Sequence, residues 1–232
     1  MTVAPELNAR TGQLWLAEST FAVLVAHTGG VTDAPGMPPT PEIRDFPEQL
    51  NLLRAAGVLD AEDRPHDALS PALQSLAEQT GSIELAFQGR AMRGWVDREG
   101  AALLMPPGED GRGLLTYMPF SLLPGALAKM ADVRPSPRLA PVQPVPYEEG
   151  DWAGIRRHWR LSVKWRLDAG TDGQPTAVEV LDTDGGLWLL ENEDGNGQLI
   201  AWPTIPTTVW RRIIRLVTAP AKLRTAGKHR AA

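Results

Sequence analysis

Apolar residues recur at helical spacing through the first 80 residues and predict three helices. The first can be capped by Thr11 and ends near Gly29 and Gly30. The second follows a proline-rich loop, residues 35–41, and ends at Gly57, because glycine readily adopts the left-handed terminating conformation. The predicted apolar faces are Leu14, Ala17, Phe21, Leu24 and Val25 in the first helix, Phe46, Leu50 and Leu53 in the second, and Leu69, Ala72, Leu73 and Leu76 in the third.

From Ser82 the apolar period changes to two, which is typical of strands with one buried face. The pattern predicts a meander of four strands, with a hairpin at residues 97–100, and then a helix opened by Pro119. The predicted strands are residues 83–87, 92–96, 101–105 and 114–118, and the apolar face of the helix is Phe120, Leu123, Leu127 and Met130.

A second run of the same elements follows a proline-rich linker. Apolar and polar residues alternate strictly over residues 158–167, which predicts a strand buried on one face. Three further strands and a closing helix are predicted after it. They are strands at residues 177–181, 186–190 and 198–202, and a helix with Val209, Ile213, Leu216 and Val217 on its apolar face.

The two runs indicate an internal duplication. The turn at 97–100 corresponds to 182–185 at a separation of 85 residues, whereas Pro119 and Pro203 correspond at 84. Chance recurrence of common Asp-Gly hairpins is the alternative. The predicted fold class is α+β, with a central antiparallel sheet from two pseudo-symmetric β-meander-plus-helix halves, flanked by helices. We expect one domain over 1–232, divided into N-terminal helices and first half (1–131), linker (132–156), second half (157–218) and basic tail (219–232).

Composition narrows the class of protein. No apolar run is long enough for a membrane span, no basic and apolar leader opens the sequence, and cysteine is absent, so a cytoplasmic location is expected. The net charge is −5, yet residues 211–232 hold seven basic and no acidic side chains. This segment is a candidate contact for nucleic acid or an acidic partner. Because the acidic remainder would repel phosphate, no nucleic-acid partner is expected.

The residue patterns favour no catalytic chemistry. None of the four histidines stands in a metalloprotease or hydrolase motif, and the glycine-rich turns are followed by strands where a phosphate loop would open a helix. The turn at 182–185 resembles the start of a calcium loop, but its glycine comes too early. We therefore expect no enzyme activity, no cofactor and no metal site.

Eight tryptophans are many for 232 residues. Tryptophan is enriched at binding hot spots, and the residues near strand ends, Trp95, Trp188 and Trp202, are candidates for an interface. Core packing is the alternative for each of them.

Several segments resemble the EspG family of type VII (ESX) secretion-associated chaperones of actinobacteria. They are LRAAGVLD at 53–60, WVDREGA at 95–101, VEVLDTDGG at 178–186 and AWP at 201–203. The resemblance implies a sheet of two pseudo-symmetric halves flanked by helical bundles. It also implies a cytosolic chaperone that holds an export substrate, a PE/PPE-like or WXG100-like helical protein, and keeps it soluble.

Two sets of residues are predicted to bind that partner. The resemblance places Asp97, Arg98 and Glu99 in a turn beside the partner site. The aromatic and aliphatic residues of the second half add Trp188, Ile200 and Trp202, because an interface that shields a substrate has to offer apolar surface. A homodimer is left open.

A small-molecule or anion-binding protein, or an enzyme, is the alternative function. Arg160, Lys164 and Arg166 occupy alternate positions on the polar face of the strand at 158–166, where they could hold an anion. A deep pocket over that face would favour this interpretation.

Overall fold

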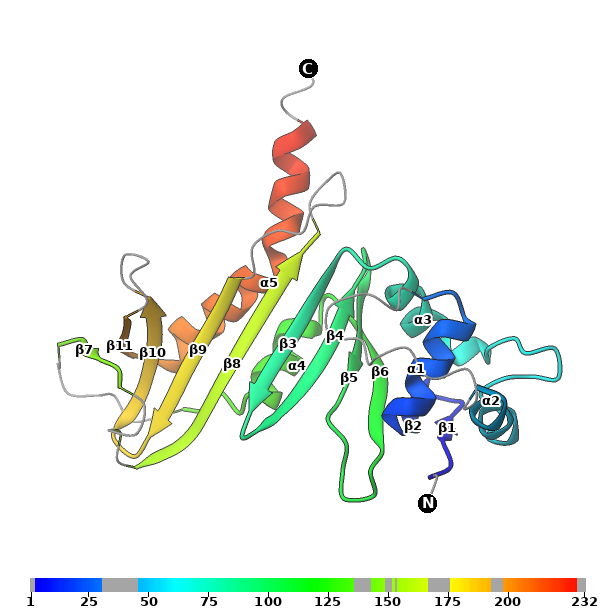
Figure 1. Cartoon of the computed structure of the whole chain (residues 1–232). Helices are drawn as coiled ribbons and strands as arrows, with labels where there is room; N and C mark the ends of the chain where they lie inside the picture. The colour runs from blue at the N-terminus through cyan, green and yellow to red at the C-terminus, as the bar shows by residue number, and fades with distance from the viewer. Residues whose placement is uncertain are drawn as a thin grey trace. The chain divides into compact units, whose positions relative to one another are not determined.

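The computed structural model describes residues 3–30, 46–135, 143–148, 152, 154–166, 176–192 and 198–228, with side chains up to Thr218. The predicted loop at 35–41, the turn at 193–197 and the side chains of the basic tail beyond Thr218 lie outside this part of the chain. In each part of the chain the strands form an antiparallel sheet, and helices accompany it (Figure 1). The predicted α+β fold class is confirmed.

The chain divides into two compact units. The first unit comprises residues 1–84, 91–121 and 166–171, and the second comprises 85–90, 122–165 and 172–232. The helix that follows the first meander therefore belongs to the second unit. The boundaries expected from the sequence remain a prediction.

The first unit has strand order β1-β2-β6-β5-β4-β3, except that the end of β3 and the first residue of β4, within residues 85–90, belong to the second unit. Its elements are β1 (Glu6–Asn8), β2 (Gln13–Leu16), α1 (Glu18–His27), α2 (Phe46–Ala55), a short 3-10 helix (Asp67–Leu69), α3 (Ser70–Ala77), β3 (Gly81–Phe87), β4 (Arg90–Val96), β5 (Gly100–Leu104) and β6 (Gly113–Pro119). Side chains of α1, α2 and α3 and of one sheet face form its core, in which the rings of Phe21 and Trp95 lie 5.5 Å apart. Trp95 is fully buried, so it is a core residue.

Two predicted helix starts are wrong. Residues 13–16 form strand β2, since Leu14 and Leu16 are buried alternately and β2 pairs with both β1 and β6. Gly12 has φ +67° at the preceding turn, and α1 begins only at Glu18. Likewise Pro119 ends β6 and α4 begins at Leu123, because the backbone N–H of Phe120 still donates to the carbonyl of Glu99.

The second unit has strand order β8-β9-β10-β11-β7. Its elements are α4 (Leu123–Met130), β7 (Val145–Pro146), β8 (Ile155–Trp165), β9 (Thr176–Thr183), β10 (Gly186–Asn192), β11 (Leu199–Thr204) and α5 (Pro206–Lys228). Helix α5 packs against β8, β9 and α4 and lies behind these strands in the view of Figure 1. No helix in the described residues combines the length and the apolar character needed to cross a bilayer.

Each unit contains an antiparallel meander, as the duplication predicts, but the register differs from the one inferred. The first hairpin closes between Asp97 and Gly100, and the second closes between Thr183 and Gly186. Gly100 and Gly186 are therefore equivalent, at a separation of 86 residues rather than 85. The physical reason is that a two-residue hairpin is defined by its closing pair, which sequence similarity of the turn does not fix.

Candidate protein-binding surfaces

Asp97 holds the β4–β5 hairpin in place and is 5% exposed. Its carboxylate accepts hydrogen bonds from the backbone N–H groups of Glu99 (2.6 Å) and Gly100 (2.8 Å) and from the Ser75 hydroxyl of α3 (2.6 Å). Three donors satisfy the buried carboxylate and join the turn to the helix. Asp97 is therefore a structural residue, whereas Arg98 and Glu99 at the tip are exposed.

The hairpin also packs closely against β6. A Cβ on Gly100 would lie 2.3 Å from the carbonyl oxygen of Met118 and 2.7 Å from the Tyr117 hydroxyl. Burial raises the pKa of Tyr117, and the negative charges of Asp97 and Glu99 raise it further. The base of the hairpin is thus rigid, and only its tip can meet a partner.

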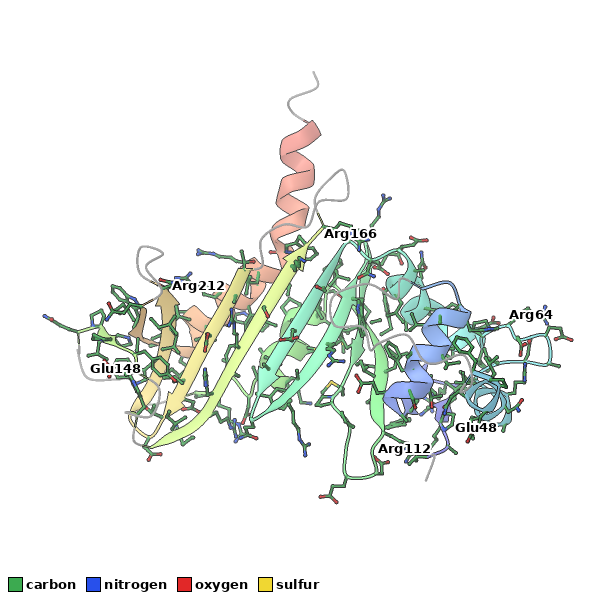
Figure 2. All side chains as sticks on the ribbon, viewed as in Figure 1. Glu48, Arg64, Arg112, Glu148, Arg166 and Arg212 are labelled. Atoms are coloured by element: carbon green, nitrogen blue, oxygen red, sulfur yellow. The ribbon has the colours of Figure 1, made fainter. Side chains whose placement is uncertain are left out.

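One face of the second unit's sheet is covered by α5. Trp159, Leu161, Val163 and Trp165 of β8 are buried, as the strict alternation predicts. The indole N–H of Trp165 donates to the carbonyl of Leu216 at 3.3 Å, which fixes α5 on this face. Arg212 of α5, labelled in Figure 2, pairs with Glu191 of β10 at 2.6 Å.

An aromatic cluster lies on the other face of the same strands. Trp152 contacts Trp188 edge to face at 4.9 Å between ring centroids, and Tyr147 lies 6.0 Å from Trp152. The three rings pack on a small core of Leu181, Leu190 and Ala201. All three are half-buried, so Trp188 is largely used in packing within the unit.

The three partner-binding residues predicted in the second half do not form one surface. Trp202 pairs with Leu189 and Ile200 pairs with Glu191, which puts both side chains on the face opposite Trp188. Ile200 is buried at 8% exposure, whereas Trp202 is 39% exposed. Of the three, Trp202 alone offers a broad apolar surface to a partner.

Exposed apolar surface is concentrated in the second unit. The large hydrophobic side chains that are clearly exposed in the described residues are Leu122, Val145, Ile155, Trp202 and Ile205, and all five belong to this unit. Of these five, Trp202 and Ile205 lie three positions apart at the junction of β11 and α5, and Ile205 also lines a groove.

A groove of about 800 Å³ runs between α4 and α5. Its apolar lining includes Gly125, Ala128, Val133, Ile205 and Trp210. A Cβ added to Gly125 would lie 4.0 Å from the Trp210 ring, so there is room for a methyl group at this point but a larger side chain would project into the groove. The volume is within the range of ordinary binding pockets. The sequence did not predict this groove, because no residue pattern indicates that α4 and α5 pack together.

Arg160, one cation of the alternative anion site, faces a carboxylate. Glu179 of β9 lies 2.7 Å from His158 and 3.9 Å from Arg160, so a carboxylate already offsets charge on this face. Arg160, Lys164 and Arg166 line neither the groove between α4 and α5 nor the two smaller cavities beside Arg157 and Asp182. The described residues also contain no group of three or more His, Asp or Glu side chains placed to share a metal ion.

A scan of protein-family models and a search of curated sequences find no match. Solved structures do match. The type VII secretion system chaperone EspG5 of Mycobacterium tuberculosis, determined in complex with the PE25–PPE41 dimer, superposes with a TM-score of 0.63. The match covers 89% of this chain and 96% of that chain at 11% sequence identity.

The chain is an α+β protein. More narrowly, it has an EspG-like fold, as the sequence resemblance implied. At this identity the likeness concerns the fold alone.

Proposed function

We propose that this protein is a cytoplasmic chaperone that binds a helical substrate of a type VII secretion system, PE/PPE-like or WXG100-like, and keeps it soluble for export. The observation that carries the proposal is the structural match to EspG5, which extends over 96% of that chain. A match of this extent includes the strands and helices of both units, so it does not rest on one common motif.

The distribution of apolar surface supports a role in protein binding. A protein that shields a substrate has to present apolar side chains in its free state, at a cost in its own solubility. The exposed apolar residues of the second unit and the groove between α4 and α5 meet this requirement. In the first unit the exposed hairpin tip, Arg98 and Glu99, can add polar contacts.

Co-expression tests the proposal. The full chain is produced together with each PE/PPE-like or WXG100-like protein encoded beside its gene, and the products are separated by size-exclusion chromatography with light scattering. We expect one such partner to be insoluble alone and to elute with the chaperone in a defined stoichiometry. An unrelated four-helix bundle of similar length is the control, and it should not co-elute. If every neighbouring candidate fails to form a complex, the proposal is wrong.

A further inference from the structure

A second cavity adjoins the groove between α4 and α5. It has a volume of about 120 Å³ and is lined by Arg134, Pro135, Arg156, Arg157 and Asp182. Arg134 and Pro135 also line the larger groove, so the two cavities share part of their walls. The apolar lining of the groove therefore lies beside a cluster of guanidinium groups.

Positive side chains outnumber negative ones around the two cavities, even when Asp184 beside Arg156 is included. Lys129, Arg134, Arg156 and Arg157 line the two cavities, against the carboxylates Asp132 and Asp182. The whole chain carries −5, so the local excess of positive charge runs against the overall balance. A surface of this kind attracts acidic partners selectively.

The carboxylates beside these cations leave some of their N–H donors available for an external ligand. Asp132 pairs with both Arg134 and Arg157. Arg156 donates to Asp182 at 2.5 Å and to the carbonyl of Thr183 at 2.8 Å, and it lies 3.8 Å from Asp184. Each guanidinium has five N–H donors in a planar fork, so it can hold an internal carboxylate and a second, external one. Lys129 is exposed and forms no ion pair with the described side chains.

The shape of the groove favours a helix over an extended segment. Its walls are the second half of α4, the segment 132–135 and the first turn of α5. The helix ends that face the groove are capped by backbone hydrogen bonds, from Asp132 and Val133 to the last carbonyls of α4 and from Thr208 and Val209 to the carbonyl of Ile205. An added strand would find few free backbone partners there, whereas a third helix can pack its side-chain ridges between the two. The site beside Gly125 is the place where a large apolar side chain can enter toward Trp210.

We infer that this groove docks an amphipathic helix of the partner, whose apolar face enters between α4 and α5 and whose flanking Glu or Asp residues meet Lys129 and the arginine cluster. The inference rests on the proposed function for the source of the helix, and it names the docking site and the charge that the partner must carry. Trp202 would then lie outside the main contact, since it does not line either cavity.

Two synthetic peptides test the inference without knowledge of the natural partner. Both are amphipathic helices of 18 residues with leucines at helical spacing; one has glutamates flanking the apolar face, and the other has lysines at the same positions. Their affinities for the full chain are measured by isothermal titration calorimetry. We expect the glutamate peptide to bind at least about tenfold more tightly, equivalent to about 1.4 kcal/mol. Equal affinities, or no binding of the glutamate peptide, would overturn the inference.

Substitutions in the groove locate the binding. Gly125→Leu should fill the site beside Trp210 and weaken the glutamate peptide at least about tenfold, while Gly125→Ala should change little because its Cβ makes only an ordinary contact. Lys129→Glu should weaken the glutamate peptide and strengthen the lysine peptide. Arg10→Glu, an exposed cation outside the groove, is the matched control. Thermal melts followed by circular dichroism verify that each variant is folded. If Gly125→Leu is unstable, the change in peptide affinity of Lys129→Glu tests the docking site in its place.

The outcomes separate the docking site from the proposed function. If a natural partner co-elutes with Gly125→Leu and Lys129→Glu as well as with wild type, the function stands and the inferred site is wrong. If the glutamate peptide binds in the groove but no secreted protein does, the site stands and the function fails. A homodimer that Gly125→Leu converts to monomers would show that a second copy occupies the groove, and would overturn the inference.

Discussion

Trp188 and Trp202 lie on neighbouring strands but point to opposite faces of the sheet. Trp188 pairs with Pro203 and Trp202 pairs with Leu189, so the two indoles are one register position apart. A shift of one residue reverses the face of a side chain. The two residues that the sequence grouped as one surface therefore have different environments, and they should respond differently to the same substitution.

Trp188→Ala should destabilise the protein. The indole contacts Trp152 and packs on Leu181, Leu190 and Ala201, so its removal loses apolar burial and an edge-to-face ring contact. We expect a loss of about 2–4 kcal/mol in the free energy of unfolding. Urea denaturation followed by circular dichroism measures it. A loss no greater than that of Trp202→Ala would contradict the packing role.

Trp202→Ala should affect binding rather than folding. Because this side chain is 39% exposed on the helix-covered face, we expect its loss to change the free energy of unfolding by less than about 1 kcal/mol. If Trp202 belongs to the partner interface, as proposed from the sequence, affinity should fall at least about tenfold, or about 1.4 kcal/mol. Calorimetry with the co-purified partner, after a thermal melt of each variant, distinguishes the two effects. Unfolding of the variant would assign Trp202 to the core.

Asp97→Ala should disrupt the hairpin. The substitution leaves the backbone N–H groups of Glu99 and Gly100 and the hydroxyl of Ser75 without their acceptor. Leaving buried donors unsatisfied costs about 1–3 kcal/mol for each group, partly recovered by water. We expect a net loss of about 2–4 kcal/mol, measured by urea denaturation. Glu99→Ala at the exposed tip is the control, and an equal effect there would show that burial of Asp97 is not the cause.

The sequence predicts the meanders well because their period of two is strong and their turns carry Asp and Gly. The strand at Trp159–Trp165 is an example, since every apolar residue in its alternation is buried. Short strands with weak patterns were missed. Glu6–Asn8 and Gln13–Leu16 become strands because they pair with each other and Gln13–Leu16 pairs with β6, which is a tertiary contact that local propensity does not contain.

The candidate site was harder to predict than the fold. Asp97 was expected at a partner site, yet its carboxylate is satisfied by Ser75, which lies 22 positions earlier in the sequence. The groove beside Gly125 and Trp210 depends on the packing of α4 against α5, although these two residues are 85 positions apart in the sequence. Hydrophobic periodicity shows that each helix has an apolar face but not which face meets which.

The ion pair of Arg54 and Asp63 should make stability depend on pH. The guanidinium hydrogen-bonds both carboxylate oxygens, at 2.6 and 2.8 Å, and this lowers the pKa of Asp63 below its ordinary 3.8. A lowered pKa in the folded state contributes stability above pH 3.8, and this contribution is lost as the pH falls through the folded value.

Arg54→Met removes the pair and tests this dependence. The side chains are 39% and 32% exposed, so solvent screening keeps the effect small. Wild type should exceed the variant in the free energy of unfolding at pH 7, and the difference should shrink below pH 3.8. Urea denaturation at several pH values measures it, with Arg10→Met as the control. A difference that is constant with pH would mean that lost packing, and not the ion pair, is responsible.

Gly100 and Gly125 should respond in opposite directions to alanine. At Gly100 the new Cβ would be 2.3 Å from the carbonyl oxygen of Met118, and backbone of the paired strand cannot move away without breaking the ladder. We expect Gly100→Ala to destabilise by about 1–3 kcal/mol. At Gly125, within α4, the nearest atom is 4.0 Å away, and alanine is favoured over glycine in a helix by about 0.5–1 kcal/mol. A chain of this size shifts by about 2–4 °C per kcal/mol, so differential scanning calorimetry resolves a lower melting temperature for the first variant and a higher one for the second. Both substitutions add the same methyl group. Equal shifts in melting temperature would therefore show that Gly100 does not lie close to the carbonyl of Met118 in solution, and that the base of the hairpin is not rigid for this reason.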